Sequence, residues 1–151
     1  MSRRDAREAA FKLLYQIEIQ KHDEESQFDV FVDIREIRQD EVPYLKLLFD
    51  GVRTHIAELD QTFTPYLKRW TKDRLPKVDL TILRLAVYEI CYVADVPDNV
   101  AISEAVLLAR KYSSEESRSY INAVLGRLNT ELQQKGKEQE VEKEGSIDEQ
   151  N

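Results

Sequence analysis

The stretch from Val78 to Ala94 limits the possible folds of this chain more than any other segment. Apolar side chains cover most of its helical circumference, at Val78, Leu80, Ile82, Leu83, Leu85, Ala86, Val87, Ile90, Cys91, Val93 and Ala94. A helix that is apolar nearly all round must be surrounded by protein. It is too short to span a membrane, and it is polar along one stripe. The sequence therefore predicts a buried central helix at 78–94, with the other segments packed around it.

Four polar residues interrupt this apolar surface and recur three or four positions apart, namely Thr81, Arg84, Tyr88 and Tyr92. Residues at these spacings lie on one face of a helix. We therefore expect a narrow polar stripe that faces outward. Pro76 just before the helix and Pro97 soon after it indicate its two ends.

Six further segments repeat apolar residues at helical spacing. Their predicted positions are residues 5–21, Ser26 onward, Asp40 onward, Asp60 onward, a start between Asp98 and Ser103 with an end at Tyr112, and Ser113 onward. Ser113 and Glu116 have the spacing of a capping box, which favours a helix start. No convincing β alternation and no internal repeat accompany them. We predict an all-α fold of about seven helices.

The third and fourth of these helices carry more specific expectations. The apolar face of the third continues as far as Leu59, and the fourth is expected to carry Leu67 and Trp70, bent or shortened by Pro65. Gly51 lies inside the third helix, where glycine costs about 1 kcal/mol relative to alanine. The sequence therefore predicts that another helix crosses close to Gly51.

The length of 151 residues fits one domain with a core that needs no disulfides. Cys91 is the single cysteine, which excludes a disulfide framework and indicates a reducing compartment, so we expect a cytoplasmic protein with no membrane segment. Residues 136–151 contain two lysines and six carboxylates, a net charge of −4 out of −7 for the chain. We predict a folded domain at 1–134 and a disordered acidic tail at 135–151.

The residue pattern offers no catalytic or cofactor site. His22 and His55 stand far apart and outside any ligand-like cluster, which argues against a metal. Cys91 in an apolar helix is typical of a packed core thiol. The four glycines do not form a phosphate-binding loop. We expect no cofactor, no metal and no enzyme activity, and these absences favour a small helical binding protein.

Arg3, Arg4 and Arg7 form a basic cluster at the chain start. Their spacing allows all three to face one side of the first helix or its lead-in. Basic residues at a helix N-terminus oppose the helix dipole, so local stability does not explain them. One interpretation is a solvated, frayed helix end. The other is contact with nucleic-acid phosphates, to which guanidinium groups make salt-sensitive bonds.

A second cluster, Arg118, Tyr120 and Asn122, lies in the last predicted helix. Arg118 suits a phosphate, Tyr120 can stack on an unpaired base, and Asn122 can read a base edge. Alternatively, Tyr120 is a half-buried packing residue beside Ile121. The residues alone favour the packing interpretation.

Several segments together resemble the NusB family of bacterial transcription antitermination factors. They are RRDAREAA at 3–10 followed by LY at 14–15, LPKVDLTILRLAVYEI at 75–90, DVP at 95–97, VAISEA at 100–105, ARKY at 109–112 and SRSYINAVLG at 117–126. Each motif alone is weak, but their order and spacing together are specific. The resemblance covers residues 2 to about 132.

The resemblance implies two small helical bundles packed across each other and a non-catalytic role. It implies pairing with NusE, a small-subunit ribosomal protein, and binding of the pair to the single-stranded boxA element of ribosomal RNA leaders within the RNA polymerase antitermination complex. No DNA binding is expected. By resemblance Arg3, Arg4 and Arg7 contact the RNA, Tyr120 contributes to the RNA surface, and Asp79 helps to bind NusE.

A similar helical domain forms the N-terminal module of certain ribosomal RNA cytosine methyltransferases. The alternative function is therefore an RNA-binding module related to such an enzyme, without its catalytic domain. A purely structural helical scaffold is a third hypothesis, and it would leave the N-terminal arginines without RNA contacts.

Overall fold

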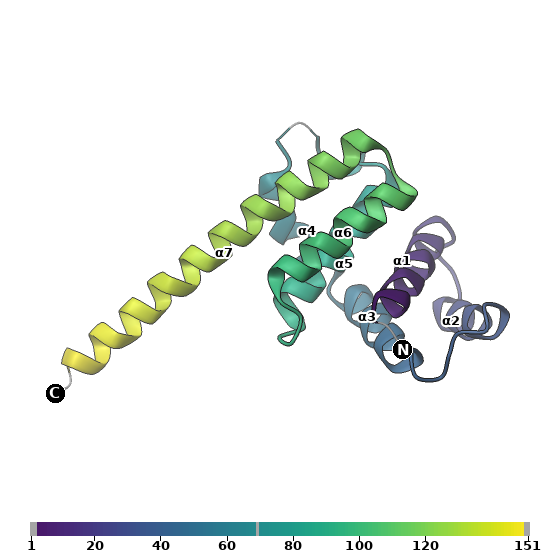
Figure 1. The fold of residues 1–151 in the computed structure, drawn as a ribbon, viewed down its shortest axis with the longest axis horizontal. Coiled ribbons are helices and arrows are strands. Elements are labelled where there is room, and N and C mark those ends of the chain that lie inside the picture. The colour runs from purple at the N-terminus through teal and green to yellow at the C-terminus, as the bar shows by residue number, and fades with distance from the viewer. Residues whose placement is uncertain (1–2, 69, 150–151) are drawn as a thin grey trace.

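The computed structural model describes residues 3–68 and 70–149, with the side chains of these residues up to 136. Over these ranges the chain forms seven α-helices, two short 3-10 helices and no strand (Figure 1). The α-helices are α1 (Arg3–Ile19), α2 (Glu24–Ile34), α3 (Val42–Thr54), α4 (Ile56–Phe63), α5 (Lys77–Tyr92), α6 (Asp98–Tyr112) and α7 (Glu115–Glu149). The 3-10 helices are η1 (Thr64–Tyr66) and η2 (Lys72–Arg74). The predicted all-α fold is confirmed.

Helix α5 lies at the centre of the fold, as its apolar sequence predicts. Ile82, Leu83 and Val87 are completely buried, and α5 packs against α1, α3, α4, α6 and α7. The helix ends two residues before the predicted Ala94, because Val93 leaves the helical conformation while its N–H still donates to the carbonyl of Glu89.

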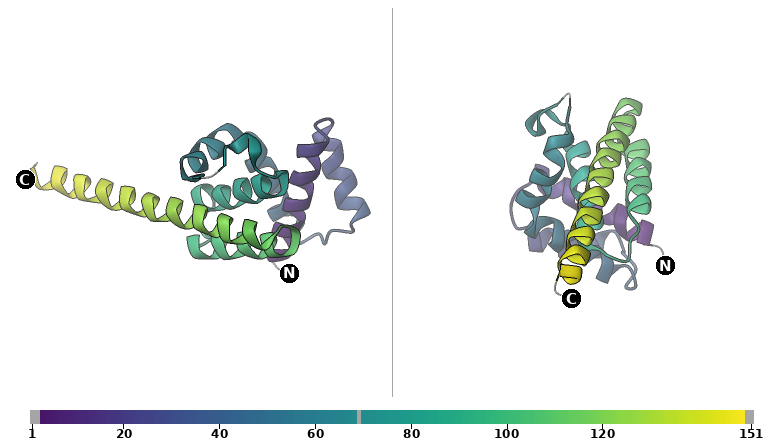
Figure 2. Two further views of the ribbon diagram at one scale, coloured as in Figure 1. Left: turned by 90° about the horizontal axis from the view of Figure 1, so that it is seen from above. Right: turned by 90° about the vertical axis from the view of Figure 1, so that its left-hand side faces the viewer.

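The remaining helices form two groups on either side of α5. Helices α1, α2 and α3 pack on one another, while α6 packs between α5 and α7, and α4 contacts α5 and α7 (Figures 1 and 2). The apolar side chains of both groups belong to one continuous core. The predicted pair of helical bundles around α5 is confirmed.

The boundary between the third and fourth helices differs from the prediction. Helix α3 ends at Thr54 because His55 leaves helical geometry, with φ −112° and ψ 18°. Asp60 therefore lies inside α4 instead of starting a helix, and it is buried. Helix α4 passes into η1 at Thr64–Tyr66, and Leu67 is extended. The predicted helix through Leu67 and Trp70 does not form.

Gly51 allows α3 and α5 to approach closely, as the sequence predicts. A Cβ atom at Gly51 would lie 2.1 Å from the Tyr88 ring of α5, far inside van der Waals contact. The loss of helix propensity at Gly51 is therefore offset by the packing of the Tyr88 ring on its backbone.

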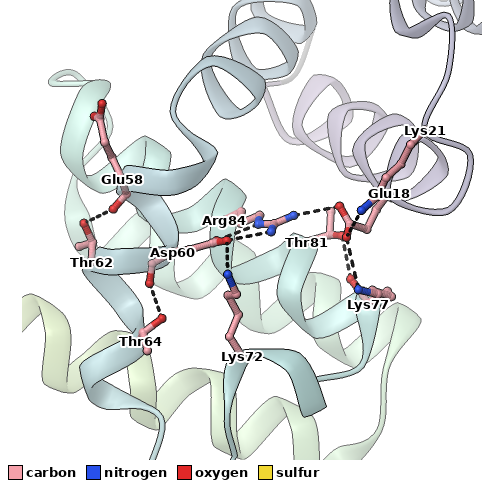
Figure 3. A network of polar contacts seen from close by, with 10 residues as sticks. All are labelled: Glu18, Lys21, Glu58, Asp60, Thr62, Thr64, Lys72, Lys77, Thr81 and Arg84. Carbon is pink, nitrogen blue, oxygen red and sulfur yellow. Dashed lines mark hydrogen bonds and ion pairs between the residues drawn. The ribbon is translucent and has the colours of Figure 1, made fainter.

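Most of the polar stripe of α5 faces inward, against the prediction that it faces the solvent. Arg84 is buried and forms two hydrogen bonds of 2.8 Å with the carboxylate of Asp60 in α4. Its Nη1 atom donates to Glu18 of α1 at 3.0 Å (Figure 3). A guanidinium can be buried when carboxylates satisfy its charge and donors. Arg84 thus joins α5 to both neighbouring groups of helices.

Helix α7 continues through Glu149 and its C-terminal half extends away from the other helices (Figure 2). The sequence predicts a disordered tail from residue 135, so the helical backbone at 135–149 differs from that expectation. The division into a domain at 1–134 and a tail at 135–151 stays a prediction, and residues 150 and 151 lie outside the described residues. Within the described part of the chain, no helix combines the length and apolar character needed to cross a membrane.

Candidate RNA-binding surface

Arg3 and Arg4 at the start of α1 are exposed but engaged by carboxylates. The Nη2 atom of Arg3 lies 2.8 Å from Asp95 in the α5–α6 connection, and its guanidinium carbon lies 4.5 Å from the centre of the Tyr44 ring. Arg4 forms hydrogen bonds of 2.9–3.1 Å with Glu104 of α6, and 64% of its side chain is exposed. Both guanidinium groups are thus held in fixed positions at the molecular surface.

Arg7 is placed differently, because only 5% of it is exposed. Its Nε and Nη2 atoms donate to both oxygens of Glu89 at 2.7 and 2.8 Å, and Tyr44 donates to the same carboxylate at 2.5 Å. Burial opposes the charge of Arg7, but the bonds to Glu89 outweigh it and raise its pKa. Burial, together with the hydrogen bond to Glu89, also raises the pKa of Tyr44. Arg7 is therefore buried, so it does not share an exposed side of α1 with Arg3 and Arg4.

Asp79, the predicted partner-binding residue, is buried at the start of α5. The hydroxyls of Ser113 and Ser117 donate to its two carboxylate oxygens at 2.7 and 2.6 Å. A direct contact with a partner protein would first have to break these hydrogen bonds. The observed geometry makes Asp79 the residue that fixes the start of α7 against α5.

The cap of α7 is Ser114, one residue later than the predicted capping box places it. The Ser114 hydroxyl accepts a hydrogen bond of 3.0 Å from the backbone N–H of Ser117. Ser113 is unavailable as a cap because its hydroxyl is bound to Asp79.

The second basic and aromatic cluster lies on the first turns of α7. Asn122 is exposed, and Arg118 is partly exposed with its Nη2 atom 3.7 Å from the carboxylate of Glu115. The Tyr120 ring packs against the apolar core, and burial raises the pKa of its hydroxyl. Tyr120 is therefore neither a fully buried core residue nor a freely exposed ring.

The two clusters occupy separate parts of the surface. Arg3 and Arg4 contact the α5–α6 connection and α6, whereas Arg118, Tyr120 and Asn122 lie on α7 near the start of α5. Single-stranded nucleic acids bind along cations and stacking rings, and the two clusters together contain both kinds of group.

A cavity of about 710 Å³ lies beside Tyr120, between the start of α5, the first turns of α7 and the segment that contains Trp70. Lys68, Trp70 and Arg127 line it and were not identified from the sequence. The sequence predicts that Trp70 belongs to the fourth helix, whereas the structure places it outside any helix and 42% exposed. Its place between Pro65 and Pro76 is the sequence signal that could have indicated this.

The NusB family model matches residues 4–130 of this chain. The chain is 44% identical over 128 residues to the transcription antitermination protein NusB of Acetivibrio thermocellus, covering 85% of this chain and 88% of that protein. It is 44% identical over 131 residues to NusB of Listeria welshimeri, covering 87% of this chain and 98% of that protein.

The chain belongs to the NusB family.

Solved NusB structures have the same fold. The T. maritima NusB structure is 31% identical, with a TM-score of 0.78 over 87% of this chain and 92% of that chain. A complex of the antitermination factors NusB and NusE with double-stranded RNA contains a chain that is 28% identical, with a TM-score of 0.76 over 83% of this chain and 94% of that chain. These matches confirm the resemblance that the sequence motifs indicated.

Proposed function

We propose that this NusB-family chain is a transcription antitermination factor. It pairs with NusE, and the pair binds the single-stranded boxA element of ribosomal RNA leader transcripts. The complex then supports processive elongation by RNA polymerase. The chain itself contributes binding surfaces and no catalysis.

The observation that carries this proposal is the pair of exposed guanidinium groups at the start of α1 in a chain of this family. Arg3 and Arg4 are held at fixed positions by Asp95 and Glu104, although the whole chain is acidic. A local basic surface counts for more than net charge in binding a phosphate backbone. The relationship to the NusB chain in the NusB–NusE–RNA complex supports both proposed partners.

The candidate site residues take different roles in this proposal. Arg3 and Arg4 contact phosphates, Arg118 and Asn122 contact the RNA from α7, and Tyr120 contributes to the RNA surface. Arg7 acts through position, because its ion pair with Glu89 fixes the first turns of α1.

Asp79 also has an indirect, positioning role in this proposal. It contributes to NusE binding by holding α7 against α5 through Ser113 and Ser117. A direct contact between Asp79 and NusE is the competing role.

The test is direct measurement of RNA affinity with and without NusE. The expected result is that the chain and NusE together bind a boxA oligoribonucleotide more tightly than either protein alone. A scrambled oligoribonucleotide and a DNA strand of the boxA sequence serve as controls, and both should bind more weakly. Equal affinity for the scrambled RNA, or no effect of NusE, would contradict the proposal.

A further inference from the structure

Glu104 of α6 is a buried carboxylate beneath the arginines of α1. Only 10% of its side chain is exposed, whereas 64% of the Arg4 side chain is exposed. The Nε atom of Arg4 lies 3.1 Å from both carboxylate oxygens, and its Nη2 atom lies 2.9 Å from one of them. The guanidinium of Arg4 is therefore accessible, while the carboxylate that holds it is covered by protein.

The same carboxylate also faces Arg7, one turn further along α1. The Nη1 atom of Arg7 lies 3.6 Å from Glu104. Arg7 is itself fixed by Glu89, to which it donates at 2.7 and 2.8 Å. Because Arg7 is buried and held by two carboxylates, Glu104 has a fixed position from which it holds Arg4.

Asp95 holds Arg3 in a different way. The Asp95 side chain is 69% exposed, and it meets Nη2 of Arg3 at 2.8 Å. A phosphate can replace an exposed carboxylate of this kind. It cannot reach the buried position of Glu104, so an RNA phosphate has to bind Arg4 where Glu104 has placed it.

A guanidinium that is already fixed lowers the entropic cost of binding RNA. Immobilising a mobile long side chain weakens an interaction by about two- to tenfold in affinity. Phosphate contacts set the register and orientation of a nucleic acid, and base contacts then read its sequence. A phosphate site at one fixed place therefore favours the RNA whose bases meet their contacts in that register.

Glu104 also lowers the general attraction of this surface for anions. Its negative charge offsets one arginine charge, which weakens the electrostatic attraction for any RNA backbone regardless of sequence. RNAs that bind through charge alone lose affinity without any gain from the fixed position of Arg4. Both effects of Glu104 thus increase the preference for a matching RNA.

We propose that Glu104 is a positioning residue that sets the RNA selectivity of the arginine surface by holding Arg4 in one place. This inference rests on the proposed RNA binding and goes beyond it, because it assigns selectivity to a buried carboxylate that does not contact the RNA. The sequence did not identify Glu104 as a candidate site residue.

Glu104→Gln tests the inference with NusE present. Glutamine keeps the size of the side chain and removes the charge that holds Arg4. The ratio of boxA affinity to scrambled-RNA affinity should fall about two- to tenfold, because Arg4 is no longer ordered before binding. A rise or a fall of the same size for both RNAs would overturn the inference, since a carboxylate that only supports the fold or only competes with phosphate changes both alike.

Glu8→Gln is the matched control. Glu8 also lies where α1 meets α6, and it binds Lys111 at 2.6 Å. The substitution removes one negative charge, as Glu104→Gln does, but it leaves the contact between Arg4 and Glu104 in place. The affinity ratio should therefore stay unchanged. An equal loss of selectivity in Glu8→Gln would overturn the inference, because net charge alone would then explain it.

Arg4→Lys gives an independent test that keeps the buried carboxylate. Lysine retains the positive charge, but its ammonium group is a point charge on a flexible stem and cannot reproduce the two-bond contact with Glu104. Selectivity should fall as in Glu104→Gln, while the slope of log boxA affinity against log salt should not change. Unchanged selectivity in Arg4→Lys would overturn the inference even if Glu104→Gln does not fold.

Two further measurements separate this inference from the proposed function. Calorimetry should give the same NusE affinity for Glu104→Gln and the natural chain, and a lower affinity that accounts for the lost selectivity would overturn the inference. A natural chain that shows no preference for boxA with NusE present would overturn both the inference and the proposed function. A natural preference for boxA that both variants retain would overturn the inference alone.

Discussion

Arg7 and Glu89 face each other across 82 positions of sequence and form a two-bond ion pair, with N–O distances of 2.7 and 2.8 Å. Both residues are buried, and Glu89 is 1% exposed. The pair fastens the first turns of α1 to the last turns of α5. The surface arginines Arg3 and Arg4 lie one turn before Arg7, so their positions depend on this pair.

Removing the charge of Glu89 should therefore destabilise the fold. Glu89→Gln leaves the guanidinium of Arg7 buried with only the longer contact to Glu104 at 3.6 Å, and losing one partner of a buried pair costs about 3–5 kcal/mol. Urea unfolding measures the change in free energy. The matched control is Asp33→Asn, since Asp33 is exposed on α2 and its substitution should leave the free energy of unfolding nearly unchanged. Equal effects of the two substitutions would contradict a structural role for Glu89.

Asp79 should prove more important for stability than for direct partner contact. Asp79→Ala removes two charge-assisted hydrogen bonds from serine hydroxyls, each worth about 1.5–3 kcal/mol, and should lower the melting temperature. Asp79→Asn keeps an acceptor, so it should remain folded and bind NusE within about twofold. A stable Asp79→Asn variant with at least tenfold weaker NusE affinity would show a direct contact instead.

Acidic pH should lower the free energy of unfolding, because it protonates Glu18, the carboxylate that pairs with Arg84. Burial opposes the charge of Glu18, but the neighbouring Arg84 outweighs it and lowers the pKa of the carboxyl below its ordinary 4.5. A lowered folded-state pKa contributes stability that is complete above the unfolded pKa and is lost as the pH falls through the folded pKa. The free energy of unfolding should thus fall from about pH 4.5 downward. In Glu18→Gln this decline should be smaller, and an identical pH profile would exclude the contribution of Glu18.

The segments that form helices could be predicted from the sequence, because apolar spacing and helix caps are local signals. The central helix at 78–94 and the close approach at Gly51 follow from the residues themselves. The end of α3 at His55 was not predictable in this way, because the apolar spacing continues through it. The backbone of His55 leaves helical geometry there, and the burial of the next helix through Asp60 depends on Arg84, far along the chain.

The candidate site shows the same division between local and distant information. Arg7 precedes Ala10 and Leu14 by three and seven positions, which places it on the apolar stripe of α1, so its predicted grouping with Arg3 and Arg4 on one basic side did not follow this spacing. Its partner Glu89 could not be predicted, because pairing over that separation depends on the fold. The burial of Asp79 likewise depends on Ser113 in the α6–α7 connection and on Ser117 in the first turn of α7.

Asp95 should compete with RNA for Arg3. The two side chains form an exposed ion pair at 2.8 Å, which a phosphate must displace before it binds the guanidinium. Exposed ion pairs are weak, so Asp95→Asn should strengthen RNA affinity by no more than about fivefold. Asp40→Asn is the control, because it releases Arg38 on a different surface and should leave RNA affinity unchanged. Weaker binding by Asp95→Asn would show that this carboxylate orients Arg3 for RNA instead of competing.

The salt dependence of boxA RNA affinity tests the proposed arginine surface most directly. Arg3 and Arg4 are each proposed to contact one phosphate, and each contact to a single strand contributes about 0.7 to the slope of log affinity against log salt. With NusE present, the double variant Arg3→Ala and Arg4→Ala should flatten that slope by about 1.4. A variant with Arg35→Ala and Arg38→Ala, exposed cations beyond α2, should keep the natural slope. A natural slope in the Arg3 and Arg4 variant would contradict the account.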